Sequence, residues 1–283
     1  MALRGHPFHQ QSAFSSYGRP RRAAPTVTPV FTKAIVKQPC ASFASGETSV
    51  DLGTPDLEAA LRQHKAYCDA LESCGLELIR LPPDDKHPDS TFVEDTAVLT
   101  PRGAVLTRPG ADSRRGEVES IAQVIRVHFD NVHSIEAPGT LDAGDVCEAG
   151  EHFFIGISRR TNEHGAKQLA SILDSFCYSS TLIDIRGLSN ILHLKSGLAY
   201  LPGKRLVIID ALRELEEFSG YDRIRLNSTE EYAANCLSLN GKILIASGFP
   251  ALKDELEGYS IISLDMSEFQ KMDGGLSCLS LRF

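Results

Sequence analysis

The sequence predicts an α/β fold in the form of a five-bladed, pseudo-symmetric propeller built from hairpin-plus-helix repeats. Pairs of apolar segments around short glycine-containing turns recur at least four times along the 283 residues, and helical patterns lie between them. The recurrence distance is roughly 40–50 residues, which is typical of radial repeats whose units bury their apolar faces against one another. An open α/β sheet is the alternative, and it would need longer parallel crossovers and fewer hairpins.

Four predicted β-hairpins carry the repeat. A turn such as Asn240-Gly241 between β-rich segments is among the best short-range signals for a hairpin. A fifth unit is expected to be completed by the terminal strands Lys33–Lys37 and Leu276–Leu281. The hairpin strands are Ala97–Thr100 with Ala104–Thr107, Asp145–Glu148 with Glu151–Phe154, Leu198–Leu201 with Lys204–Ile209, and Cys236–Leu239 with Lys242–Ala246.

Helices are expected between the hairpins. The clearest helix begins near Thr54, which can cap it, with Pro55 in its first turn. Apolar residues follow at helical spacing from Leu57 to Cys68, and the pattern ends before Gly75. Three more helices are predicted at Arg115–His128, Glu163–Phe176 and Ala251–Glu257.

The first thirty residues differ in composition from the rest of the chain. No Asp or Glu precedes Glu47, whereas Arg4 and Arg19 lie among serine, glutamine, glycine and proline. This composition is typical of a disordered or targeting extension. We therefore expect a single propeller domain over residues 31–283. Its location would be cytoplasmic, or mitochondrial or plastid if residues 1–30 form a transit segment.

The composition of the chain limits the kinds of partner that it could bind. The net charge of −8 and pI near 5.6 argue against nucleic acid, whose non-specific binding requires clustered Lys and Arg. The longest apolar runs, such as Leu206–Ile209, are strand-sized and far shorter than the roughly 20 residues of a membrane helix. Seven cysteines without a C-x-x-C pair fit neither a disulfide framework nor a zinc ribbon. These features favour a small-molecule partner and a reducing compartment.

Reactive side chains precede the first strand of several units. Glu94 and Asp95 precede Ala97, Asp142 precedes Asp145, His193 precedes Leu198, and Cys278 lies in the final segment. In a radial arrangement these positions converge on the axis, so the scattered residues form one candidate site.

Cys278, His193 and Asp142 have the residue types of a nucleophilic site. A thiolate forms near neutral pH only beside a cation or base, which His193 supplies, and Asp142 then fixes the imidazole tautomer. Taken singly, each has a more ordinary interpretation: a buried structural cysteine, a surface histidine and a turn aspartate. The case therefore depends on the three residues occurring together.

Six ordered motifs resemble the dimethylarginine dimethylaminohydrolases, particularly the bacterial type, from about Thr32 to Phe283. The resemblance implies a five-bladed α/β propeller that hydrolyses Nω-methylated arginines to citrulline and an alkylamine. It implies neither a metal nor an organic cofactor. The motifs are Asp89-Ser-Thr-Phe-Val-Glu94-Asp95, Thr107-Arg-Pro-Gly-Ala-Asp-Ser-Arg114-Arg115, Gly139-Thr-Leu-Asp142-Ala-Gly-Asp, Ser158-Arg-Arg160-Thr-Asn162, His193-Leu-Lys195 and Asp273-Gly-Gly-Leu-Ser-Cys278.

The same resemblance implies a role for each motif residue. Cys278 would be the nucleophile, His193 the general acid and base, and Asp142 its orienting carboxylate. The substrate-binding set would be Asp95 with Glu94 for the guanidinium, Arg114 and Arg160 for the substrate carboxylate, and Asp89 with the backbone at Met272 for the amino-acid head. Glu47 stands where bacterial relatives carry an apolar lid residue, and a charged lid would alter the preferred head group.

Three other functions remain open at this stage. An arginine deiminase-like hydrolase of another guanidino compound would carry an acidic residue two places after the histidine, where this chain has Lys195. A non-catalytic propeller binding protein would have degenerate catalytic positions. A structural zinc protein using Cys278 and His193 lacks a closely spaced ligand pair. The sequence leaves oligomeric state undetermined, with a homodimer as one candidate.

Overall fold

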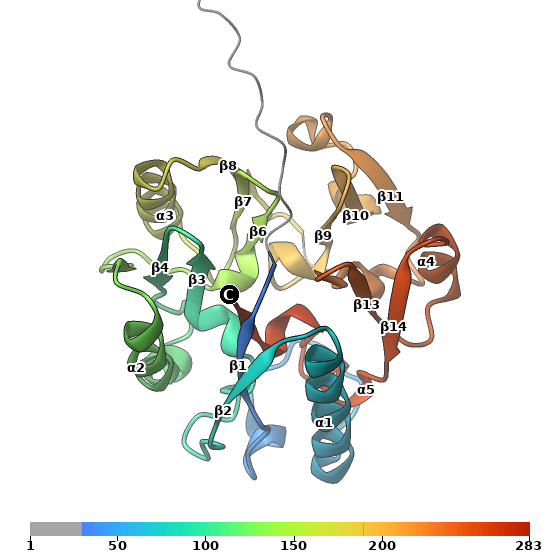
Figure 1. Cartoon of the computed structure of the whole chain (residues 1–283), viewed down its shortest axis with the longest axis horizontal. Helices are drawn as coiled ribbons and strands as arrows, with labels where there is room; N and C mark the ends of the chain where they lie inside the picture. The colour runs from blue at the N-terminus through green and yellow to red at the C-terminus, as the bar shows by residue number, and fades with distance from the viewer. Residues whose placement is uncertain (1–29, 189) are drawn as a thin grey trace, which may run out of the picture.

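Five three-stranded β-sheets stand around a central axis in the computed structural model, which describes residues 30–188 and 190–283 (Figure 1). The helices α1 to α4 lie at the periphery, and the C-terminus lies near the centre of the ring (Figure 1). This arrangement confirms the predicted five-bladed α/β propeller. Of the predicted extension, residues 1–29 lie outside the described residues.

Each sheet has the same order. An inner strand pairs antiparallel with a middle strand, and the middle strand pairs parallel with an outer one. Four sheets are, from the inside out, β3 (Ala97–Thr100), β4 (Gly103–Leu106) and β5 (Val132–Ser134); β6 (Val146–Glu148), β7 (His152–Ile157) and β8 (Ser179–Asp184); β9 (Leu198–Leu201), β10 (Arg205–Ile209) and β11 (Asp222–Leu226); and β12 (Leu237–Leu239), β13 (Lys242–Ala246) and β14 (Ser260–Leu264).

The four predicted hairpins form the inner two strands of these sheets. At the β12–β13 turn, Asn240 and Gly241 both have positive φ, at 46° and 82°, as a two-residue hairpin turn requires. The parallel outer strands were not predicted, because none directly follows a hairpin turn and most alternate only weakly between buried and exposed residues.

The fifth sheet joins the two ends of the described chain. Strand β1 (Lys33–Lys37) lies between β15 (Leu281–Arg282) and β2 (Glu77–Leu81), with Ala34 opposite Arg282. The terminal strands therefore pair as expected. The predicted strand over Leu276–Leu281 is wrong for most of its length, because Ser277–Leu279 forms a 3₁₀ turn.

The segment Ser277–Leu279 forms a turn because a side chain, rather than a neighbouring strand, bonds to its backbone. The backbone N–H of Ser277 donates to Oδ1 of Asn235 at 2.9 Å, and that of Cys278 donates to the carbonyl of Gly275 at 3.2 Å. These bonds fold the segment into a turn before β15 begins.

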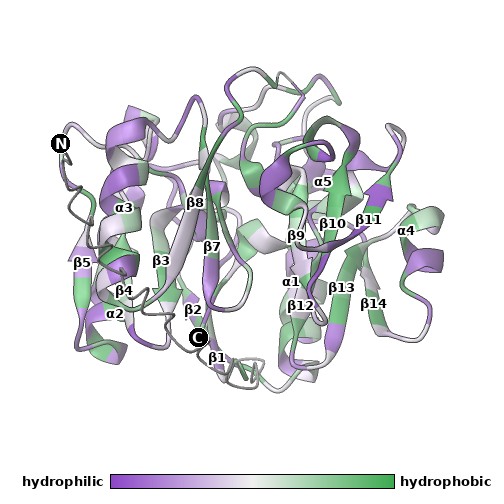
Figure 2. Cartoon of the chain, turned by 90° about the horizontal axis from the view of Figure 1, so that it is seen from above, coloured by the Kyte–Doolittle hydropathy of each residue, from purple (hydrophilic) through white to green (hydrophobic). Residues whose placement is uncertain are grey.

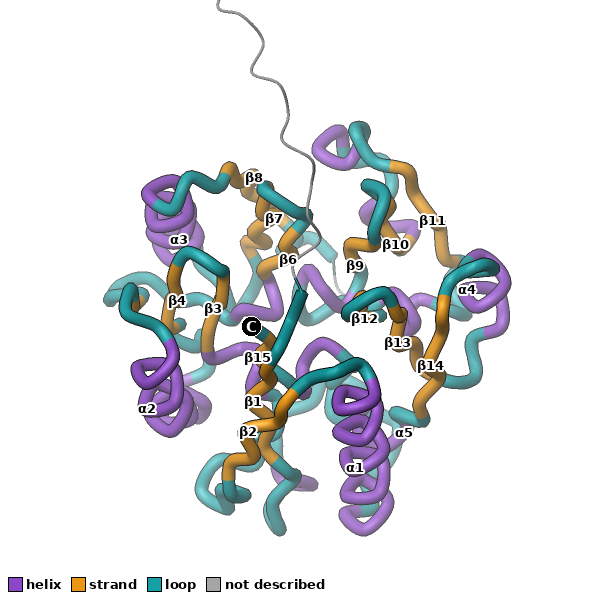
Figure 3. The backbone as a smooth tube through the Cα atoms, viewed as in Figure 1, coloured by secondary structure: helices purple, strands orange, loops and turns teal. Residues whose placement is uncertain are grey.

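Helices cover the outside of four sheets (Figure 3). The cap of the first helix lies two residues later than predicted, because the side chain of Asp56, rather than that of Thr54, accepts from the backbone N–H of Ala59 at 2.7 Å. The predicted helix at Arg115–His128 is divided, since its start belongs to a 3₁₀ turn at Asp112–Glu117. The helices are α1 (Leu57–Ser73), α2 (Val118–His128), α3 (Glu163–Ser175), α4 (Pro250–Glu255) and the short α5 (Ser267–Gln270).

The hydrophobic core lies between neighbouring blades. Strands β10 and β13 are largely hydrophobic, whereas the outer helices α3 and α4 carry many hydrophilic residues (Figure 2). Aromatic side chains join adjacent blades, as where the rings of Phe154 and Phe218 meet edge to face with centroids 4.9 Å apart. Within residues 30–188 and 190–283, no helix is long and apolar enough to cross a membrane.

Candidate active site

Short 3₁₀ turns precede the inner strands and contact one another around the axis. In chain order they are Val93–Thr96, Ala143–Asp145, Leu194–Ser196, Glu231–Ala234 and Ser277–Leu279. These turns carry or adjoin the reactive residues predicted from the sequence. Residues far apart in the chain therefore meet at one end of the inner strands, as do Glu94 and Ser277, which are 183 positions apart and hydrogen-bonded.

One small pocket brings most of the predicted site residues together. Its volume is about 20 Å³, which is room for roughly one water molecule. A substrate therefore enters only if the surrounding side chains or the Glu47 loop move. The predicted residues that line it are Glu47, Asp89, Asp95, Arg114, Arg160, His193, Met272 and Cys278.

His193 and Asp142 form a buried pair. Nε2 of His193 lies 3.2 Å from Oδ2 of Asp142, and the other carboxylate oxygen accepts from the backbone N–H of Gly110 at 2.8 Å. Burial lowers the pKa of His193, but the nearby carboxylates of Asp95, Asp145 and Asp142 outweigh burial and raise it to about 9. At neutral pH the imidazole is a cation and can donate a proton.

Asp145 supports this pair and was not predicted as a site residue. Its oxygens accept from the hydroxyls of Ser158 and Thr161, each at 2.6 Å, and from the backbone N–H of Leu194 at 3.0 Å. Burial raises the pKa of Asp145 to about 6. Asp145 thus fixes the backbone next to His193, and its place three residues after Asp142 was the only sequence signal.

Asp95 is held as a carboxylate inside the pocket. Oδ1 accepts from the backbone N–H of Gly144 at 2.9 Å, and Oδ2 accepts from Nη1 of Arg114 at 2.6 Å. Burial raises the pKa of Asp95, but His193 and Arg114 outweigh burial and lower it to about 2. A fixed anion at this position suits a guanidinium ligand.

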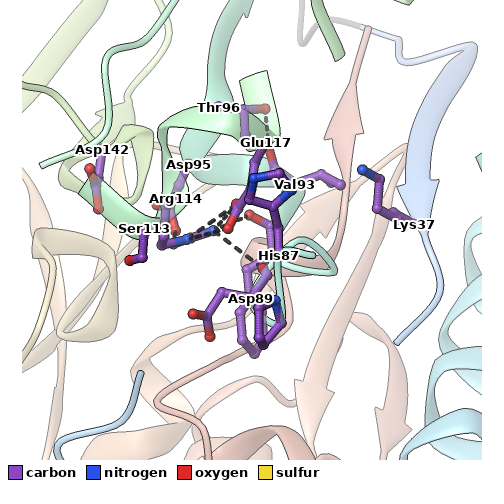
Figure 4. A network of polar contacts seen from close by, with 12 residues as sticks. Lys37, His87, Asp89, Val93, Asp95, Thr96, Ser113, Arg114, Glu117 and Asp142 are labelled. Carbon is purple, nitrogen blue, oxygen red and sulfur yellow. Dashed lines mark hydrogen bonds and ion pairs between the residues drawn. The ribbon is translucent and has the colours of Figure 1, made fainter. Parts of the chain in front are cut away.

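Arg114 is the centre of a buried polar network (Figure 4). Besides Asp95 it contacts the carboxylate of Glu117, at 2.8 Å from Nη2, and the backbone carbonyls of Asp89 and Phe92. Burial lowers the pKa of Arg114, yet Glu117 and Asp95 raise it well above its usual range. Arg114 therefore stays charged and positions Asp95. Glu117 was missed by the sequence analysis, although its i+3 spacing from Arg114 is readable.

Cys278 lines the pocket as a neutral thiol. Its sulfur accepts from the backbone N–H of Gly275 at 3.3 Å. Burial, with the negative charges of Glu94 and Asp95, raises the pKa of Cys278 to about 12. The side chain is therefore a thiol at neutral pH, and a cation that enters beside Asp95 would lower this pKa.

Glu94 lies apart from this pocket. Its carboxylate accepts from the hydroxyl of Ser277 at 2.6 Å and pairs with Nζ of Lys195 at 2.7 Å and with Arg282 at 3.3 Å. Glu94 and Lys195 line a second cavity that shares no lining residue with the first. The structure thus separates Glu94 from Asp95, its neighbour in sequence.

The Glu47 loop closes the outer side of the pocket. Glu47 pairs with Nη2 of Arg160 at 2.7 Å and contacts the hydroxyl of Ser113, and its backbone N–H donates to Asp89 at 3.1 Å. The Ser113 hydrogen bond, aided by Arg160, lowers the pKa of Glu47. Burial raises the pKa of Asp89. Nη1 of Arg160 is buried without a hydrogen-bond partner among the described residues.

Three of these side chains are spaced as metal ligands would be. Ligand atoms of Asp95, Asp142 and His193 lie within 4.8 Å of one another. Arg114, 2.6 Å from Asp95, places a positive charge beside them, and the carboxylates already accept hydrogen bonds. This environment suits a protonated imidazole better than a divalent cation.

Taken together, the propeller and the pocket define the class of this protein as a hydrolase of the five-bladed α/β-propeller type. The chain belongs to the dimethylarginine dimethylaminohydrolase family. It is 43% identical to the N(G),N(G)-dimethylarginine dimethylaminohydrolase of Pseudomonas aeruginosa, over 90% of this chain and 100% of the relative. It is 34% identical to the Streptomyces coelicolor protein of the same name, over 88% of this chain and 96% of the relative. The resemblance seen in the motifs is confirmed.

Solved structures agree with this assignment. A cysteine-to-serine variant of the Pseudomonas aeruginosa enzyme, complexed with citrulline, matches with a TM-score of 0.87 and 42% identity, over 90% of this chain and 100% of that one. The N-terminal domain of ArgZ, a cyanobacterial arginine dihydrolase, matches with a TM-score of 0.79 at 20% identity, which shows a shared fold. No protein-family model matches the chain.

Proposed function

We propose that this protein hydrolyses Nω-methylated arginines, asymmetric dimethylarginine and monomethylarginine, to citrulline and an alkylamine, through an S-alkylthiouronium intermediate on Cys278. The observation that carries the proposal is one pocket lined by a thiol, a protonated imidazole and a buried carboxylate, Asp95, held ionised by His193 and Arg114. A guanidinium is a poor electrophile, so it must be held in place for sulfur to reach its central carbon.

Substrate binding would itself activate the nucleophile. The guanidinium pairs with Asp95, and its positive charge offsets the two carboxylates that, together with burial, raise the pKa of Cys278. The thiol then loses its proton to solvent. The resulting thiolate attacks the guanidinium carbon, which forms the C–S bond of a tetrahedral adduct.

His193 would serve both halves of the reaction. As an imidazolium it donates its proton to the methylated nitrogen, the C–N bond breaks, and dimethylamine or methylamine leaves. The neutral imidazole then accepts a proton from water, whose oxygen attacks the thiouronium carbon. The C–S bond breaks, which restores the sulfur of Cys278 and yields the urea group of citrulline. Asp142 keeps the ring oriented throughout.

The outer part of the pocket would bind the amino-acid head. Arg160 is the best-placed ligand for the substrate carboxylate, because its Nη1 is unpartnered and its other contact is the half-exposed Glu47. Arg114 retains one uncommitted hydrogen on Nη1, while Asp89 and the backbone at Met272 line the same pocket. For the guanidinium, Asp95 alone is supported, since Glu94 is paired with Lys195.

A substrate panel tests this function. Purified protein should release citrulline and dimethylamine from asymmetric dimethylarginine, and turn over arginine and agmatine more slowly. Cys278→Ser should lose the activity, whereas Cys177→Ser, at an exposed cysteine, should retain it. Equal or faster turnover of arginine would support the deiminase-like alternative. The absence of any ureido product, and of any released amine or ammonia, from every guanidine of the panel would support a non-catalytic binding protein.

All seven cysteines are free, which supports a reducing compartment as the place of action. We infer the cytoplasm, or an organelle if residues 1–30 act as a transit segment. Imaging of the full chain fused at its C-terminus to a fluorescent protein, beside the same fusion without residues 1–30, distinguishes the two. A homodimer stays a prediction that sedimentation would test.

A further inference from the structure

The larger of the two cavities runs along the propeller axis. Its volume is about 640 Å³, which is within the usual range of small-molecule sites, about 300–1,000 Å³. The inner strand of every sheet contributes to its wall, namely β3, β6, β9, β12 and β15 (Figure 3). We refer to this cavity as the axial channel. It shares no lining residue with the pocket that contains Cys278.

The axial channel has an inner end and an outer end. Its inner end is formed by Glu94, Lys195 and Ser277, which are bonded to one another as described above. Its outer end is lined by the hairpin turns that join inner and middle strands, including Arg102 and Gly203. A ligand would therefore enter from the hairpin side, opposite the catalytic residues.

Nearly every charge in the channel is neutralised by a neighbour. Arg102 pairs with Glu151 at 2.6 Å at the outer end. At the inner end, Glu94 pairs with both Lys195 and Arg282. Within residues 30–188 and 190–283, the one charged lining residue that makes neither a hydrogen bond nor an ion pair through its side chain is Glu148.

Glu148 is the last residue of β6 and lies partly buried among apolar and aromatic side chains. Phe153, Tyr178 and Tyr200 line the same cavity. Burial raises the pKa of Glu148 to about 7, and Glu151 raises it further while Arg282 and Lys195 lower it. A carboxylate in such surroundings is costly unless a cation pairs with it.

The aromatic wall is also suited to a cation. The guanidinium of Arg102 already lies 4.1 Å from the ring centroid of Tyr178, in a cation–π contact. Tyr200 belongs to the neighbouring blade and lines the channel without such a partner among the described residues. The wall thus combines one unpaired anion, an aromatic face and a large apolar surface.

We propose that the axial channel is a second ligand site, distinct from the catalytic pocket, which binds an organic amine with its protonated nitrogen on Glu148 and its apolar body between the inner strands. An ammonium group donates to the carboxylate, and the apolar body replaces water along the wall. The ligand of this site must carry a single cationic group on an otherwise apolar body. The zwitterionic head of an arginine does not meet this requirement.

Calorimetric titration of the full chain with tryptamine at pH 8 tests the proposal, with 3-methylindole as the neutral analogue. Tryptamine should bind to the wild type, and saturating citrulline should not displace it. Glu148→Gln should weaken the binding of tryptamine by about tenfold or more, as expected for loss of a charged partner, and leave the affinity for 3-methylindole unchanged. Glu72→Gln is the matched control, because Glu72 is exposed, paired with Arg80 and outside the channel lining, and this variant should bind tryptamine as the wild type does.

A second measurement keeps the test independent of the substitution. The carboxyl carbon of Glu148, followed by NMR, should titrate at lower pH with tryptamine bound than without it. Equal affinity in wild type and Glu148→Gln, displacement by citrulline, or an unchanged titration would overturn the proposal. Hydrolysis of methylarginine by Glu148→Gln should persist, so failure here and failure of the proposed reaction are separate results.

Discussion

Nε2 of His193 lies 3.2 Å from Oδ2 of Asp142, and both side chains are almost completely buried. The bond joins two 3₁₀ turns of adjacent blades, so the orientation of the imidazole depends on how the blades pack. Asp145 lies three residues after Asp142, in the turn that Asp142 precedes. Its carboxylate accepts a hydrogen bond from the backbone N–H of Leu194 at 3.0 Å. The histidine is therefore fixed both at its ring and at its backbone.

Asp142→Asn should leave the fold intact and reduce citrulline release by about two to four orders of magnitude, because the amide cannot stabilise an imidazolium or select its tautomer. It should also lower the pKa of His193. Measurement of initial rates, with thermal unfolding as the check on folding, decides this. Asp184→Asn is the control, since Asp184 is exposed and paired with Arg186. A rate for Asp142→Asn within a few-fold of wild type would contradict the assigned role.

Stability should fall as pH rises through the titration of His193. The folded pKa of about 9 lies above the unfolded value near 6.5, so the stabilisation is fully present below 6.5 and is lost as pH approaches 9. Between pH 7 and 8.5 the free energy of unfolding should decrease by on the order of 2 kcal/mol. Asp145 and Glu148, with pKa values of about 6 and 7, titrate mainly below this window.

Urea unfolding at several pH values measures this slope. His193→Asn has no group to titrate and should show a much flatter dependence over the same interval. A slope in the variant equal to that of the wild type would assign the effect to other groups.

Gly144 allows two catalytic-pocket side chains to approach its backbone. A Cβ at this position would lie 2.7 Å from both Oδ1 of Asp95 and Nδ1 of His193. Gly144→Ala should therefore displace one of them and lower citrulline release by about a hundredfold, as expected for misplaced catalytic groups. Gly220→Ala is the control, because nothing lies within 4 Å of its Cβ position. Full activity in Gly144→Ala would show that the pocket tolerates the shift.

Sequence alone predicted the hairpins and the convergence of reactive residues, because turn chemistry and a repeat period are local properties. It could not separate Glu94 from Asp95. Successive residues of a 3₁₀ turn point about 120° apart, so these two carboxylates face different cavities. Glu117 was not predicted for a similar reason. Its role comes from its contact with the buried guanidinium of Arg114, and no sequence motif marks it.

The contact of Glu47 with Arg160 bears on substrate affinity. Glu47 is half-exposed on its loop, and its carboxylate pairs with Nη2 of Arg160, whose unpartnered Nη1 we propose as a ligand of the substrate carboxylate. Two carboxylates would then compete for one guanidinium. Because a partly exposed ion pair is worth roughly 0–1 kcal/mol, this competition should be modest.

Glu47→Gln should therefore lower KM for asymmetric dimethylarginine by about two- to fivefold and leave kcat almost unchanged, since the amide retains shape but loses the competing charge. Steady-state kinetics at constant ionic strength measures both constants. Nω,Nω-dimethylagmatine, which has no carboxylate, is the control substrate, and its KM should not fall. A rise in KM for dimethylarginine in Glu47→Gln would mean that the lid carboxylate contacts the substrate ammonium and contributes to binding rather than opposing it.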